Sequence, residues 1–154
     1  MQIAIRHPEL SDKIIAASPL FKRNGAPSQF WEFMKNGTFD QMPLAYKDAF
    51  LRVNPDSARL MNMYQKCEER MIRFIDIPDN LISAVKSPVL LINGDKDVAT
   101  SEHMVTISTL IPDCRLAIIP GGHGEYIGEI STLKPGYKAS DFVIGLVENF
   151  LNEK

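Results

Sequence analysis

An aspartate and a histidine each close a short apolar segment of the chain. Residues 88–97 read Pro-Val-Leu-Leu-Ile-Asn-Gly-Asp-Lys-Asp and end on Asp97, and residues 115–123 read Arg-Leu-Ala-Ile-Ile-Pro-Gly-Gly-His and end on His123. A histidine that acts as a general base needs a partner that fixes its tautomer and stabilises the imidazolium, and a carboxylate does both. The two residue types therefore predict proton-transfer chemistry, in which Asp97 orients His123.

Both segments also have simpler interpretations. A Gly-Asp-x-Asp turn often only bonds its carboxylates to backbone amides, and a histidine in a glycine-rich loop is often only exposed. The stretch between Asp97 and His123 favours the functional interpretation. It contains one helical pattern and one apolar run, which would return the chain beside the strand that precedes Asp97. Glycines at 121, 122 and 124 would permit the tight backbone that turns an imidazole over the sheet.

The elements that would position these residues alternate along the chain. Apolar runs at 13–17, 89–92 and 116–119 have the length of strands, and helical patterns occupy 101–110 and 140–152. Strands that alternate with helices indicate parallel crossovers, so the expected fold class is α/β, with a parallel sheet of about three strands flanked by helices. In such sheets the loops at the carboxyl ends of the strands carry the ligand site. The aspartate and the histidine both lie in those loops.

Residues 25–75 interrupt this alternation. Three prolines each precede a helical pattern, as suits proline near a helix start. In the third pattern Asn54 is the expected N-cap, and the apolar residues that follow at helical spacing are Leu60, Tyr64, Cys67, Met71 and Phe74. Aromatic residues concentrate in this block, which indicates either its own core packing or the wall of a pocket for an apolar substrate.

Composition limits the partners. The net charge is −2 with acids and bases interspersed, which provides no basic surface for nucleic acid. No apolar run approaches the roughly 20 residues that cross a membrane, and the first residues lack the apolar region of a secretory signal. Cys67 and Cys114 are far apart and have no metal-ligand spacing. We expect one cytoplasmic domain without a cofactor, a nucleic-acid partner or a membrane partner.

The sequence resembles the C-terminal half of an α/β-hydrolase. The resemblance rests on the acid turn in 88–97, the histidine turn in 115–123 and the closing helix, and residues 1–10 are similar to the helix that follows the nucleophile of that family. It covers nearly all of this chain but about half of a typical family member. It implies a single partial α/β-hydrolase domain over residues 1–154, in which residues 25–75 form a helical lid.

The resemblance also implies a catalytic triad in the chain order nucleophile, acid, histidine. Asp97 matches the acid and His123 the histidine, while Asp95 is expected to stabilise the turn. The sequence departs from the family because it has no Gly-x-Ser-x-Gly segment, so the nucleophile is expected outside the chain, just before Met1. An aspartate nucleophile, as in dehalogenase-like relatives, stays open at that position.

The implied function is hydrolysis of an apolar ester, thioester or amide. The alternative is a non-catalytic fragment or interaction module derived from a hydrolase. In the parent fold the strand at 13–17 pairs with the strand that delivers the nucleophile, so one edge of this strand is expected to be unpaired here. Such an edge invites pairing with another chain, and the simplest expected assembly is a two-fold dimer joined near this strand.

Overall fold

The computed structural model describes residues 1–132, 134–136 and 138–153. The chain forms two compact units. The first, which we call the sheet unit, consists of residues 1–26 and 76–154, and the second, the helical unit, spans Pro27–Ile75. Each unit has its own packing and is described separately.

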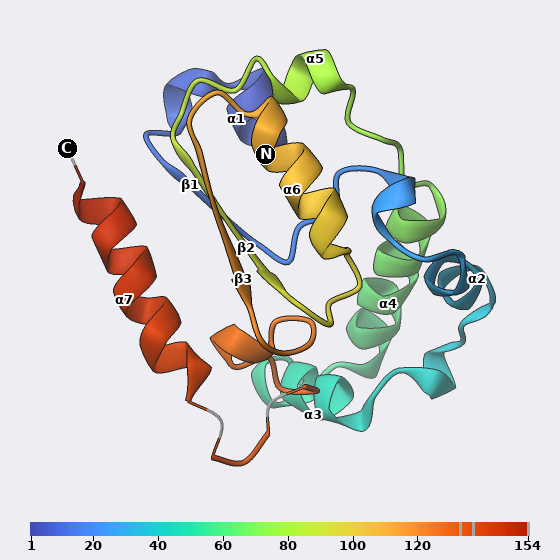
Figure 1. The fold of residues 1–154 in the computed structure, drawn as a ribbon. Coiled ribbons are helices and arrows are strands. Elements are labelled where there is room, and N and C mark those ends of the chain that lie inside the picture. Colours follow the sequence, from blue (N-terminus) through green and yellow to red (C-terminus); the bar gives the residue numbers. More distant parts are fainter. Residues whose placement is uncertain (133, 137, 154) are drawn as a thin grey trace. The chain divides into compact units, whose positions relative to one another are not determined.

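A parallel sheet forms the centre of the sheet unit (Figure 1). Its strands are β1 (Ile14–Ala17), β2 (Val89–Gly94) and β3 (Cys114–Ile119), in the order β1-β2-β3. All pairings are parallel, which confirms the predicted sheet and its order along the chain. The three strands therefore end at one edge, where the loops that follow them meet.

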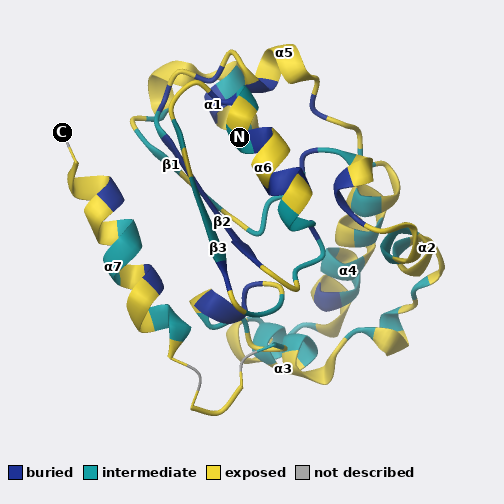
Figure 2. Ribbon diagram, viewed as in Figure 1, coloured by how far each residue is buried: buried dark blue, intermediate teal, exposed yellow. Residues whose placement is uncertain are grey.

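The central strand β2 is buried along its whole length, as its dark blue ribbon in Figure 2 shows. Val89 and Leu91 pack into one apolar cluster, and Leu90 and Ile92 pack into a second. Successive side chains of a strand point to opposite faces, so the two clusters lie on the two faces of the sheet. A strand covered on both faces is expected to be continuously apolar rather than alternating. For this reason the apolar residues 89–92 predict a buried strand.

Helices cover both faces of the sheet. The first cluster includes Met104 and Ile107 of α6, and the second includes Val143 and Phe150 of α7. The helices of this unit are α1 (Gln2–Arg6), α5 (Asp79–Ile82), α6 (Ser101–Leu110) and α7 (Ala139–Asn152), with short 3-10 turns η1 (Pro8–Leu10), η2 (Arg23–Gly25) and η4 (Glu125–Ile127). Lys13 next to β1 donates from Nζ to the last carbonyls of α7, which ties that helix to the sheet.

The helical unit contains α2 (Ser28–Asn36), the 3-10 turn η3 (Phe39–Gln41), α3 (Leu44–Val53) and α4 (Ser57–Ile72). Aromatic side chains pack its elements together, with ring centroids 5.4 Å apart for Trp31 and Phe74 and 5.5 Å apart for Phe39 and Tyr64. The predicted helical character of this block is observed. Its function as a lid stays a prediction.

The cap of α4 differs from the expectation. Asp56, rather than Asn54, is the N-cap, and its Oδ1 accepts hydrogen bonds from the amides of Ala58 and Arg59 at 2.9 and 3.1 Å. Asn54 instead follows the last turn of α3, where its amide donates to the Phe50 carbonyl. Both residues favour caps, and the length of α3 decides which one is adjacent to the next helix.

None of the helices in the described part of the chain combines the length and the apolar character that crossing a membrane requires.

Candidate acid and histidine site at the sheet edge

The turn that follows β2 carries Asp97 and packs directly against the turn that follows β3. The amide of Asp95 donates to the Ile119 carbonyl at 2.9 Å, and the amide of Lys96 donates to the Gly121 carbonyl at 3.0 Å. A Cβ atom at Gly94 would lie 2.4 Å from the Gly121 carbonyl oxygen, closer than real contacts allow. Glycine at 94 therefore lets the two turns approach closely.

Asp95 joins the same two turns. Its Oδ1 accepts a hydrogen bond from the Gly121 amide at 2.8 Å. The side chain is thus engaged by the backbone, as the resemblance implies for a turn-stabilising residue, and it does not contact the histidine.

Asp97 and His123 are hydrogen-bonded to each other. The distance between His123 Nδ1 and Asp97 Oδ1 is 2.9 Å. The Asp97 side chain is 0% exposed, whereas 52% of the His123 side chain is exposed. The expected proximity of the two residues is observed, and the arrangement shields the carboxylate while leaving part of the imidazole open to solvent.

Ser18 holds the other oxygen of the same carboxylate. It follows β1 directly, and its Oγ donates to Asp97 Oδ2 at 2.5 Å and lies 2.8 Å from the hydroxyl of Tyr126. The amide of Gly124, next to the histidine, donates to Ser18 Oγ at 3.3 Å. One hydroxyl therefore connects the ends of all three strands.

The backbone of Ser18 is strained. Its φ is 48°, the single positive value outside glycine in the described chain. This left-handed conformation costs an ordinary residue about 1–2 kcal/mol, and such strain persists where the surroundings over-determine it, often at functional sites. The role of Ser18 is not predictable from its neighbours, because the Ser-Pro dipeptide at 18–19 indicates only the end of a strand.

Asp97 and His123 shift each other's pKa in opposite directions. Burial raises the pKa of Asp97, but hydrogen bonds from His123 and Ser18 and the charge of His123 outweigh it, and the pKa lies below its ordinary value. The hydrogen bond to Asp97 raises the pKa of His123 above 6.5, with burial opposing and the charges of Asp97 and Glu129 supporting the rise. Both shifts favour a carboxylate next to an imidazolium.

Glu125 and Tyr126, which follow His123 closely in the chain, stabilise the turn that carries the histidine. Glu125 is buried; its Oε2 accepts from the Gly122 amide at 2.8 Å, and its Oε1 lies 3.1 Å from Lys134 Nζ. The fully buried Tyr126 donates from its hydroxyl to the Ile92 carbonyl at 2.9 Å. The polar groups of both side chains therefore bind neighbouring parts of the sheet unit. Tyr126 also lies next to Ser18, which donates to Asp97.

The fold of this chain is similar to that of known proteins, although its sequence matches none of the family models or curated proteins. Solved structures do match. A hydrolase from Pseudomonas aeruginosa is 17% identical, with a TM-score of 0.61 over 99% of this chain and 60% of its own. The meta-cleavage product hydrolase of Pseudomonas fluorescens is 20% identical, with a TM-score of 0.63 over 98% of this chain and 59% of its own. A hydrolase of the α/β fold from Bacillus anthracis is 15% identical, with a TM-score of 0.58 over 95% of this chain and 60% of its own.

The chain has the fold of the C-terminal part of an α/β-hydrolase. It spans about three-fifths of the length of these hydrolases, 60%, 59% and 60% respectively. The partial α/β-hydrolase fold expected from the acid and histidine turns is thereby confirmed. At these identities the likeness concerns the fold, and the chemistry of Asp97 and His123 has to be argued from their own geometry.

Proposed function

We propose that the chain supplies the acid and the histidine of a hydrolase that cleaves an ester, thioester or amide by a nucleophile–histidine–aspartate mechanism. The observation that supports this most directly is the 2.9 Å contact between His123 Nδ1 and the shielded Asp97 carboxylate. A buried carboxylate on Nδ1 is the arrangement that orients a histidine base.

The roles of the two residues follow from the geometry. Asp97 accepts a hydrogen bond from the Nδ1–H group and thereby fixes the tautomer in which Nε2 carries a lone pair. Nε2 of His123 makes no hydrogen bond within the described part of the chain, and it would take the proton of a nucleophile and return it to the leaving group. The raised pKa of His123 strengthens it as a base, and the lowered pKa of Asp97 keeps the carboxylate ionised.

The nucleophile in this proposal lies outside the 154 residues. No Gly-x-Ser-x-Gly segment occurs in the sequence. Ser18 contacts the carboxylate of Asp97 rather than the imidazole, so His123 has no path to its proton. Ser131 donates its hydroxyl proton to Glu129 at 2.6 Å. A serine nucleophile would give its hydroxyl proton to Nε2 of His123, whereas an aspartate nucleophile would attack as a carboxylate and Nε2 would take the proton of the water that cleaves the resulting ester intermediate.

The substrate class in this proposal is a small apolar ester-like molecule. Its support is the composition of the helical unit, in which the aromatic side chains of the chain concentrate. Apolar and aromatic walls with few polar groups are typical of sites for small apolar molecules.

The coding sequence upstream of Met1 provides the decisive test. An in-frame strand and elbow that carry a serine or an aspartate and lead into Gln2 are expected. The product that includes this segment should hydrolyse 4-nitrophenyl butyrate. Asp97→Asn should lower kcat by about 10⁴-fold, and His123→Ala should abolish most of the rate.

Asp12→Asn and His7→Ala are the matched controls, because both residues are exposed, and their activity should be unchanged. Activity that survives both substitutions in the site would refute the proposed roles. Absence of an upstream nucleophile together with absence of turnover would leave the non-catalytic interaction module as the function. The 154-residue chain alone should not hydrolyse the ester above background, since it lacks the nucleophile and the donors that stabilise an oxyanion.

A further inference from the structure

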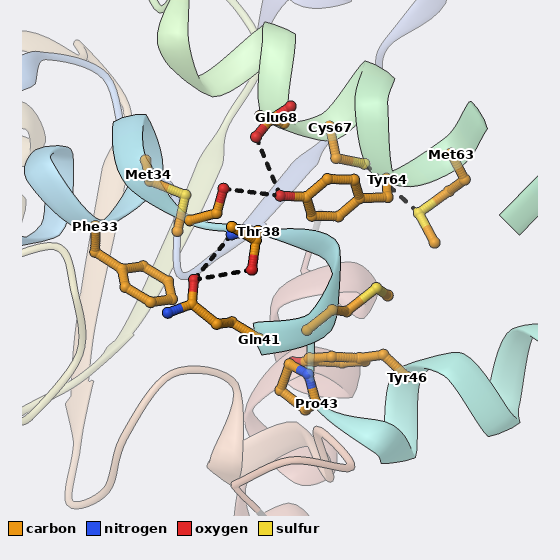
Figure 3. A pocket seen from close by; sticks show the side chains of 12 residues that line it. Phe33, Met34, Thr38, Gln41, Pro43, Tyr46, Met63, Tyr64, Cys67 and Glu68 are labelled. Atoms are coloured by element: carbon orange, nitrogen blue, oxygen red, sulfur yellow. Dashed lines mark hydrogen bonds between the residues drawn. The ribbon is translucent and has the colours of Figure 1, made fainter. Parts of the chain in front are cut away.

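The helical unit contains a partly open cavity of about 310 Å³ (Figure 3). All of its walls come from residues 33–68, so its geometry belongs to this unit alone. Thioether, thiol and aromatic side chains form most of the lining, among them Phe33, Met42, Tyr46, Met63, Tyr64 and Cys67. A cavity of this size lies at the lower end of the range of about 300–1,000 Å³ for small-molecule sites.

One wall of the cavity carries its single charge. Glu68 is the one charged residue among the lining side chains. The Tyr64 hydroxyl lies 3.0 Å from Glu68 Oε1 and 3.1 Å from the Gly37 carbonyl, and its single proton is shared between these two acceptors. Burial and the neighbouring Glu68 raise the pKa of Tyr64, so the hydroxyl keeps its proton. This wall repels anions.

A second polar group offers a donor with a fixed orientation. Gln41 Oε1 accepts a hydrogen bond from the Thr38 amide at 2.8 Å, as a capping box requires, and a second from the Thr38 hydroxyl at 3.4 Å. In Figure 3 the dashed lines from Thr38 end on this oxygen, and among the described residues no hydrogen bond engages Gln41 Nε2. Because the cap fixes the amide, Nε2 is the part of the group left to bind a ligand.

We propose that this cavity binds a compact, uncharged, apolar molecule that carries one hydrogen-bond acceptor, such as the carbonyl of a ketone or an ester. The apolar body packs against aromatic rings and methionines, whose flexible side chains adapt to irregular shapes. The carbonyl accepts from Gln41 Nε2. Carboxylate ligands are excluded by the charge of Glu68. This inference does not depend on the proposed hydrolytic function, since every group in it belongs to the helical unit.

Methionine methyl groups provide the readout. The chain has seven methionines, and three of them line the cavity: Met34, Met42 and Met63. Titration of the ¹³C-methyl-methionine-labelled chain with 4-phenyl-2-butanone should shift these three signals in a saturable manner. The signals of Met1 and Met104, which lie in the sheet unit, serve as internal controls and should not move. Matched titration with 3-phenylpropionate, an anion of similar size, should give at least about tenfold weaker binding.

Two substitutions locate the ligand. Gln41→Glu keeps an acceptor for Thr38 but removes the amide donor, so the ketone should bind about five- to tenfold more weakly, as expected for the loss of one hydrogen bond. Cys67→Trp should fill the cavity and abolish the shifts, whereas Cys67→Ser should preserve them. The Met1 and Met104 signals and the thermal midpoint report whether each variant is folded.

Three results would overturn the proposal: no saturable shift of the cavity methyls, equal binding of the anion, or unchanged ketone binding in both Gln41→Glu and Cys67→Trp. Failure of ester hydrolysis by the longer gene product would leave this binding result untouched, so the two proposals fail separately.

Discussion

Ser18→Ala is expected to destabilise the sheet unit through the carboxylate of Asp97. The substitution removes the donor that lies 2.5 Å from Asp97 Oδ2 and the acceptor that lies 3.3 Å from the Gly124 amide. The Asp97 side chain is 0% exposed, so water does not replace the lost donor at the shielded oxygen.

The magnitude follows from two terms. A hydrogen bond to a charged group contributes about 1.5–3 kcal/mol, and alanine keeps the strained left-handed backbone of Ser18. Ser18→Ala should therefore lower the free energy of unfolding by about 1.5–3 kcal/mol. Ser18→Gly loses the same hydroxyl but relieves a strain of about 1–2 kcal/mol, so its loss should be smaller by about that amount.

The effect depends on pH with a definite sign. The pKa of Asp97 is lowered in the folded state. A lowered carboxyl pKa contributes stability that is present above its unfolded value of about 3.9 and is lost as pH falls through the folded pKa. Ser18 acts largely through this carboxylate. The difference between the unmodified chain and Ser18→Ala should therefore be largest at neutral pH and shrink in acid.

Urea unfolding followed by far-ultraviolet circular dichroism at pH 7 and pH 3 measures these differences. Ser108→Ala is the matched control, because Ser108 donates to the Val105 carbonyl on an exposed turn of α6 and should cost less than about 0.5 kcal/mol. If Ser18→Ala costs no more than Ser108→Ala at pH 7, or costs the same at both pH values, then Ser18 does not stabilise the charged form of Asp97 and the reasoning is wrong.

Three further predictions concern the sheet unit. Asp97→Asn should lower the pKa of His123 in an NMR titration, because the hydrogen bond to Asp97 is the largest cause of its raised value. The raised pKa contributes stability below about pH 6.5 that is lost as pH rises through the folded pKa, and an unchanged pKa in the variant would contradict the assignment. Gly94→Ala should cost about 1–3 kcal/mol or more in urea unfolding, because its Cβ would meet the Gly121 carbonyl at 2.4 Å; full stability would show that the two turns separate freely. Sedimentation equilibrium at micromolar concentration should show a dimer, because β1 pairs with β2 alone among the described strands and Ile15 is 37% exposed; a monomer with a sharp melt would argue against association through this strand.

Several features were readable from short stretches of sequence. Residues 89–92 of β2 are continuously apolar because both faces of the strand are covered, and a proline lies just before each of the helices α2, α3 and α4. The order of the strands also followed, since strands that are consecutive in a chain with parallel crossovers usually lie beside one another. These features are local, so a window of a few residues contains the information that specifies them.

Only part of the Asp97–His123 arrangement could be predicted from local sequence. Each of Asp97 and His123 follows a strand, and the parallel order brings the two turns to one edge, so their proximity was predictable. The distance of 2.9 Å and the shielding of the carboxylate were not. They depend on the close approach of backbone at Gly94 and Gly121, which no pattern of residue types encodes.

The tertiary structure alone decided the role of Ser18. Its hydroxyl meets Asp97 and Tyr126, residues 79 and 108 positions away in the chain, because three strand ends converge at one edge. Its left-handed backbone aims the side chain there, and the sequence around it indicates nothing more than the end of a strand. Chemistry-bearing residues and their elements are local properties of a chain, whereas the partners that set their charge and orientation are contacts made only when distant segments pack.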